Sequence, residues 1–179
     1  ATTPILELTS YKEDVTAAID AMQATGTTNI GEGLMWGWRV LSPEVPFTTG
    51  RLWSEEKNQK VIVLMTDGQN TYTRNGNHNW TAYGAFAYGV KGRLGTTNSA
   101  SAFTSAMNAK TRAACTNAKA RGIIVYTIAF RLESDTSTRA LLSACASDGS
   151  KAFVASDGAV LNQVFQAIGR EISNLRVAG

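Results

Sequence analysis

Short, nearly continuous runs of apolar residues alternate along this chain with longer stretches in which apolar residues recur every three to four positions. The continuous runs at 61–66, 122–130 and 152–155 predict strands. The helical spacing predicts five helices, at 10–24, 30–41, 102–121, 137–147 and 158–174. Strands that alternate with helices predict an α/β, Rossmann-like fold, in which a mostly parallel sheet carries helices on both faces.

Two of the predicted helices carry further signals. Ser10 and Glu13 have the spacing of a capping box at the start of the first helix. The apolar residues of that helix share one face: Val15, Ala18, Ile19 and Met22. In the helix at 30–41, Gly33 and Gly37 each cost about 1 kcal/mol relative to alanine. Close packing against another element would account for both glycines.

Length and charge narrow the class of protein. The 179 residues fit a single domain, 1–179. The net charge of +3 is scattered along the chain, whereas a nucleic-acid interface needs clustered basic residues. No window reaches the roughly 18 apolar residues of a membrane span, and the first residues lack the pattern of a signal peptide. Because the chain opens without Met and a strand-like segment follows at once, we expect a fragment of a longer anchored or secreted protein.

The connection at about 69–99 is far longer than the 2 to 6 residues usual for such crossovers, which marks it as an insertion. It should leave the sheet at the carboxyl end of the strand at 61–66. Its aromatic residues include Tyr72, Trp80 and Tyr83, which are candidates for contact with a protein partner. The alternative is that these rings fold together as a small core of their own.

The two cysteines, Cys115 and Cys145, are too few to define a disulfide framework. Two buried thiols and one bridge both remain open on this count. The single histidine, His78, argues against a zinc site built from several His and Cys ligands.

A carboxylate directly after a buried strand is the main candidate for chemistry. The sequence KVIVLMTDGQNT places Asp67 at the carboxyl end of its strand, where ligands bind in open α/β sheets. Alone, an Asp followed by Gly is an ordinary exposed turn. The sequence GTTNIGEGL adds Thr28 in a turn before a helix, where Thr28 or Asn29 could also serve simply as the helix cap.

Together these two stretches resemble the von Willebrand factor A family, whose metal-ion-dependent adhesion site is built from three loops. The resemblance implies that Thr28 and Asp67 are metal ligands, with Glu32 as a lesser candidate. Hydroxyl and carboxylate oxygens suit Mg²⁺. The Asp-x-Ser-x-Ser loop of the family is missing, because SDTST at 134–138 has a different spacing and follows a different strand. The resemblance therefore implies that the first strand is absent, and that this chain alone holds Mg²⁺ or another divalent cation weakly or not at all.

Three further stretches resemble the von Willebrand A-like region of TadG-type proteins, which take part in assembling tight-adherence (Flp) pili of bacteria. These stretches are GLMWGWRVLSPEVPF, KVIVLMTDGQNTY and FQAIGREISNLRV. This resemblance implies an extracytoplasmic adhesion or assembly module, anchored through a segment not present here, with pilus-assembly components or an adhesion target as protein partner. It also implies an oxidising compartment, in which Cys115 and Cys145 form a disulfide.

Two other functions compete with adhesion. A structural scaffold with a vestigial metal site would need no cation. A hydrolase using Asp67 and His78 would need a nucleophile beside a base, and His78 has no evident orienting partner in the sequence. We therefore expect no catalysis.

Overall fold

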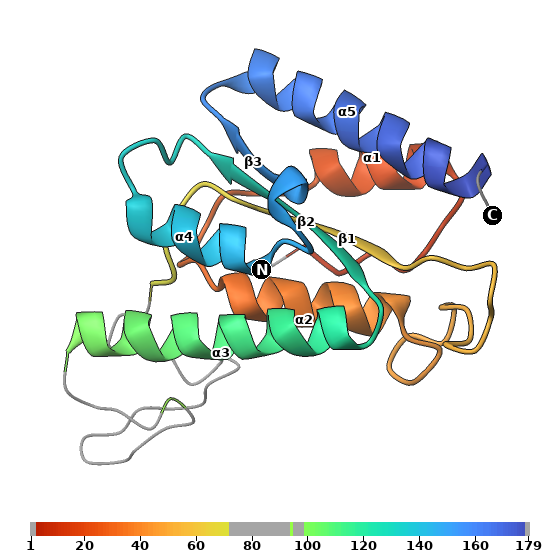
Figure 1. Cartoon of the computed structure of the whole chain (residues 1–179), viewed down its shortest axis with the longest axis horizontal. Helices are drawn as coiled ribbons and strands as arrows, with labels where there is room; N and C mark the ends of the chain where they lie inside the picture. The colour runs from red at the N-terminus through yellow and green to blue at the C-terminus, as the bar shows by residue number, and fades with distance from the viewer. Residues whose placement is uncertain (1–2, 72–93, 95–98, 178–179) are drawn as a thin grey trace.

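Parallel strands form the sheet at the centre of the protein (Figure 1). The computed structural model describes residues 3–71, 94 and 99–177. In these residues the strands are β1 (Val61–Thr66), β2 (Ile124–Phe130) and β3 (Ala152–Ala155), in the order β1-β2-β3. Both pairs of neighbours are parallel. The predicted α/β fold is confirmed, with β1 and β3 at the predicted residues and β2 beginning two residues later than predicted.

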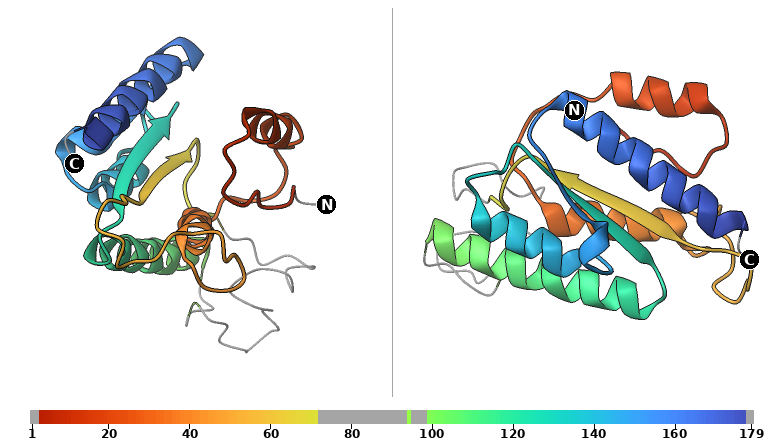
Figure 2. Two further views of the ribbon diagram at one scale, coloured as in Figure 1. Left: turned by 90° about the vertical axis from the view of Figure 1, so that its right-hand side faces the viewer. Right: turned by 45° about the horizontal axis from the view of Figure 1, so that its top comes forward.

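Helices cover both faces of this sheet, as Figures 1 and 2 show. One face carries α2 (Ile30–Leu41), α3 (Ala100–Ala120) and α4 (Thr136–Cys145), and the other carries α5 (Gly158–Val177). A short 3-10 turn, η2 (Gly149–Lys151), leads into β3. Alternate residues of β2 serve the two cores: Val125 packs against the α2–α4 side and Tyr126 against α5. This alternation follows from the two-residue period of a strand.

The first helix departs from its prediction. α1 spans Lys12–Asp20, shorter than the predicted 10–24, and it contains no buried residue. Its N-cap is Tyr11, without a side-chain hydrogen bond, so the capping box predicted for Ser10 and Glu13 is wrong. The apolar stripe remains exposed, with Ile19 at 58%. The left view of Figure 2 shows why: α1 stands away from the sheet, and no described element covers its apolar face.

Close helix packing occurs at a different glycine from those predicted. A Cβ on Gly31 would lie 2.8 Å from the hydroxyl oxygen of Thr111, so α2 and α3 approach most tightly there. Among the described residues, a Cβ on Gly33 would meet no atom of another element within 4 Å, and a Cβ on Gly37 would make an ordinary contact with Ile62 at 3.8 Å. Close packing therefore explains Gly31, which precedes Gly33 in the same helix and lies on a different side of it.

A disulfide between Cys115 and Cys145 joins α3 to α4 on the same side of the sheet. Both cysteines are buried in the core formed by α2, α3, α4 and the sheet. The pairing ties together two helices that flank β2 in the sequence.

β1 lies at one edge of the sheet, and no described residue pairs with its outer side. Val63 and Met65 on this strand are 37% and 47% exposed, whereas Val61 on the same face packs against the core on the α5 side. An apolar edge strand of this kind is a template for pairing with another strand. None of the described helices is long and apolar enough to cross a membrane.

Candidate functional site

Two loops meet at the carboxyl end of β1. One is the turn before α2, which contains Thr28 and Asn29. The other is the turn after β1, which contains Asp67 and Gly68. A Cβ built on Gly68 would lie 3.3 Å from the hydroxyl oxygen of Thr28, so the two turns are in contact. The Thr71 N–H also donates to the Thr28 carbonyl at 3.0 Å.

The local sequence accounts for the shape of each turn. Asn29 caps α2, because its side-chain oxygen accepts from the Glu32 N–H at 3.1 Å. The Thr66 hydroxyl donates to the Gly68 carbonyl at 2.8 Å and accepts from the Gly68 N–H at 3.2 Å. The Thr66 hydroxyl is therefore engaged within its own turn. Of the two alternatives for the cap of α2, Asn29 is the residue that fills it.

Asn70 holds the two loops together, and sequence reasoning did not single it out. Its side chain is fully buried, and its Oδ1 accepts from the Ile30 N–H at 2.8 Å, at the first residue of α2. Its Nδ2 donates to Asn108 Oδ1 at 2.8 Å and to Thr111 Oγ1 at 3.3 Å, both on α3. The Asn70 carbonyl accepts from the Thr104 hydroxyl at 3.0 Å. One amide thus fixes the β1 loop to the start of α2 and to α3.

Thr28 and Asp67 both lie in the two turns that meet at this end of the sheet. Asp67 is exposed and Thr28 is half-buried. Within residues 3–71, 94 and 99–177, no hydrogen bond or ion pair occupies the Thr28 hydroxyl or the Asp67 carboxylate. A hydroxyl and a carboxylate are hard oxygen donors of the kind that Mg²⁺ prefers.

The other predicted site residues lie elsewhere or outside the described part. Glu32 pairs with Arg39 along α2, with 3.7 Å between the charged atoms. Tyr72, Trp80 and Tyr83, with His78, fall outside the described residues. Among the described residues no group of three or more His, Cys, Asp or Glu side chains is placed to hold a metal ion. Asp67 therefore belongs to no such cluster in the part of the chain that the structure describes.

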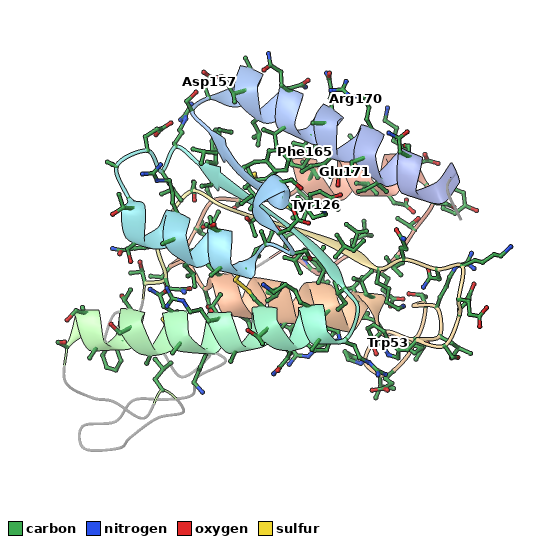
Figure 3. All side chains as sticks on the ribbon, in the orientation of Figure 1. Trp53, Tyr126, Asp157, Phe165, Arg170 and Glu171 are labelled. Atoms are coloured by element: carbon green, nitrogen blue, oxygen red, sulfur yellow. A yellow bond between two sulfur atoms is a disulfide. The ribbon has the colours of Figure 1, made fainter. Side chains whose placement is uncertain are left out.

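At the amino end of the sheet, Lys60 is the centre of a group of contacts that stabilise the fold. Lys60 precedes β1 and is almost completely buried; its ammonium group donates to the carbonyls of Leu41 and Arg51, each at 2.7 Å. The same group lies 4.6 Å from the ring centre of Trp53, which Figure 3 labels. Burial lowers the pKa of Lys60, and the charge of Glu55 opposes this effect. These contacts close the loop between α2 and β1.

Comparison with known proteins gives a family and a fold. The family model described as "von Willebrand factor type A domain" matches residues 1–167. Structures of proximal thread matrix protein 1 from the mussel byssus are similar to this chain. One is 19% identical, and the match covers 90% of the present chain and 30% of the mussel chain, with a TM-score of 0.49. Another is described as having a zinc-occupied MIDAS motif. It is 18% identical, and the match covers 97% of the present chain and 31% of the mussel chain, with a TM-score of 0.50.

The present chain spans less than a third of the length of these mussel proteins. No curated protein matches it.

Proposed function

Because this chain belongs to the von Willebrand factor type A domain family, we propose that it is a non-enzymatic adhesion or assembly module. It binds a protein partner at the carboxyl edge of its sheet, through a divalent cation held by Thr28 and Asp67. The observation that carries this proposal is the contact between the two turns, with the Thr28 hydroxyl beside Gly68 and Asn70 bonded across both loops.

The chemistry of this donor pair suits a cation that also binds a partner. Mg²⁺ requires octahedral oxygen ligation and keeps several waters when a protein supplies few ligands. Thr28 and Asp67 would fill part of such a shell and leave positions open to water or to a carboxylate of the partner. The mussel protein described with a zinc-occupied MIDAS motif supports a divalent cation in this fold.

The free edge of β1 supports the proposal that another strand completes this domain. Its outer hydrogen-bonding groups and the exposed side chains of Val63 and Met65 suit a further strand beside β1. A strand added there parallel to β1 would end near Asp67 and could bring further ligands. We therefore treat residues 1–179 as part of one domain, in which about 69–99 is an insertion.

The narrower biological setting is also part of the proposal. The disulfide between Cys115 and Cys145 supports an oxidising, extracytoplasmic compartment. Together with the TadG-like sequence stretches, this favours assembly of tight-adherence pili, with an anchor in a segment outside this chain. Alkylation of free thiols during denaturing lysis of the cells tests the compartment, because both cysteines are buried in the folded chain and a cytoplasmic protein would then be labelled at both.

The second candidate is a structural scaffold whose metal site is vestigial. The observation that favours it is that Asp67 belongs to no cluster of three or more ionisable ligands among the described residues, because one Asp and one Thr hold Mg²⁺ weakly. The two candidates differ in whether the cation binds at all, which a titration of the metal alone can measure.

The experiment follows the backbone amide NMR signals of Thr28 and Gly68 while Mg²⁺ is added. We expect saturable shifts at these two amides, lost in Asp67→Asn. Glu56→Gln is the matched control, because it removes an exposed carboxylate before β1, at the other end of the sheet. Absence of local shifts up to about 10 mM, above the range of weak extracellular cation sites, would reject the metal and leave the scaffold.

A further inference from the structure

A cavity with several polar side chains in its wall lies between α4 and β3, which pairs with β2 on the side away from β1. Its volume is about 240 Å³, and β2, α4, η2 and β3 all contribute to its wall. The polar side chains in the wall are Thr127 on β2 and Arg139 and Ser143 on α4. None of these residues takes part in the Thr28–Asp67 site.

Two of these polar groups are buried and have no hydrogen-bond partner in the part of the chain that the structure describes. They are the hydroxyl of Thr127, a residue with no exposed surface, and the Nε of Arg139. An unsatisfied buried donor or acceptor costs about 1–3 kcal/mol, and such groups are rare in native proteins. Two in one cavity indicate that an acceptor from outside the chain satisfies both.

The charge of the wall defines the kind of acceptor. Among the described residues, Arg139 is the only charged one that lines this cavity, and none of those lining it carries a carboxylate. The nearby Asp135 has its oxygens committed to the N-terminus of α4, where they accept from the N–H and the hydroxyl of Thr138 at 2.9 and 2.6 Å. A guanidinium N–H and a hydroxyl that face the same space favour an anionic acceptor.

We propose that this cavity binds a small oxyanion of the phosphate type, held by the Nε–H of Arg139 and the hydroxyl of Thr127. Ser143 follows Arg139 by one helical turn, so its hydroxyl lies on the same side of α4. The volume agrees with this class of ligand. It lies below the roughly 300–1,000 Å³ of pockets for larger molecules, and it exceeds the share of a single water, about 30 Å³.

The test measures binding of inorganic phosphate to the folded chain at constant ionic strength. Site-specific amide shifts are the main readout, because phosphate also stabilises proteins in general through exclusion from their surface. We expect saturable shifts at Ala129 and Gly149, two residues of the cavity wall. Acetate in a parallel titration shows whether a carboxylate serves as well as phosphate.

Three variants locate the site. Thr127→Val keeps the shape of the side chain and removes the hydroxyl, and Arg139→Gln removes the charge. Each of these two substitutions should raise the dissociation constant of phosphate at least tenfold. Arg170→Gln is the matched control, because it removes an exposed arginine on α5, on the other face of the sheet (Figure 3). The affinity of Arg170→Gln for phosphate should match that of the unmodified chain.

Two results would overturn the proposal. The first is an absence of saturable shifts at Ala129 and Gly149 in the unmodified chain, which would mean that water alone fills the cavity. The second is an equal loss of binding in Arg170→Gln and Arg139→Gln, which would mean that phosphate responds only to net charge. The titration of the unmodified chain decides the question even where a variant fails to fold. Neither result bears on the Mg²⁺ site.

Discussion

Replacing Asn70 by alanine tests whether one buried amide holds the candidate site together. The change removes three hydrogen bonds made by the side chain: one from the Ile30 N–H and two to α3. The amide orientation is fixed by chemistry, because the Ile30 N–H can only donate and must therefore meet the oxygen of Asn70. The Ile30 N–H is then left in a buried position without a partner.

The size of the effect follows from these contacts. A typical hydrogen bond contributes about 0.5–1.5 kcal/mol net, and a buried group left unsatisfied costs about 1–3 kcal/mol. We expect Asn70→Ala to lower the free energy of unfolding by about 2–4 kcal/mol. Asn70→Asp should keep the hydrogen bond to α2, because its carboxylate can still accept from the Ile30 N–H. The two hydrogen bonds to α3 should be lost, because the carboxylate has no N–H to donate.

Urea denaturation followed by circular dichroism measures this change. Gln69→Ala is the matched control, because Gln69 is exposed in the same turn, and it should stay within about 0.5 kcal/mol of the unmodified chain. The Mg²⁺ titration at the Thr28 and Gly68 amides then separates stability from positioning, because Asn70→Ala should bind more weakly even where it is fully folded. A stability loss below about 1 kcal/mol would refute the role given to Asn70.

Three further changes have expected outcomes. Replacing both Cys115 and Cys145 by alanine should lower the free energy of unfolding by about 3–4 kcal/mol in urea, because the bridge closes a loop with a sequence separation of 30; a loss under about 1 kcal/mol would contradict this. Gly31→Ala should cost about 1–3 kcal/mol in the same assay, because its Cβ would lie 2.8 Å from an α3 hydroxyl, and an unchanged midpoint would argue against that contact. The hydrogen bond from Lys151 is the main cause that lowers the pKa of Asp148 to about 2. Since the folded pKa is depressed, this carboxylate stabilises the fold above pH 3.8 and loses that effect as the pH falls toward 2, so Asp148→Asn should flatten the pH dependence of stability in that range.

The sheet could be predicted from sequence because the information for a buried parallel strand is local. The run from Val61 to Met65 is apolar at every position, and Thr66 and Asp67 directly after it mark the strand end and the start of the polar turn. The position of Asp67 at the carboxyl end of its strand could also be predicted, whereas its pairing with Thr28 came from the resemblance to the von Willebrand factor A family. The structure places the turns that contain the two residues in contact, and their role as metal ligands stays a prediction.

Features that depend on distant partners could not be predicted in this way. Asn70 is an ordinary polar residue in the sequence, and its role depends on α3, which lies about forty positions further along. Likewise, periodicity shows that Ile19 belongs to an apolar stripe but not which element, if any, covers it. The tight packing at Gly31 depends on the position of Thr111 on α3, which the spacing of glycines within α2 does not reveal. The cavity beside Arg139 depends on four separate elements and has no local signature.

The bridge between α3 and α4 also sets how far this domain can lengthen under tension. The segment it encloses contains all of β2, so a force applied at the chain ends reaches Cys115 and Cys145 and passes across the sulfur–sulfur bond. With a sequence separation of 30, the bridge withholds roughly 100 Å of extended chain at about 3.3–3.6 Å per residue. A module pulled between a surface and its partner would therefore reach a shorter maximum extension while the disulfide is intact and a longer one after the disulfide is reduced.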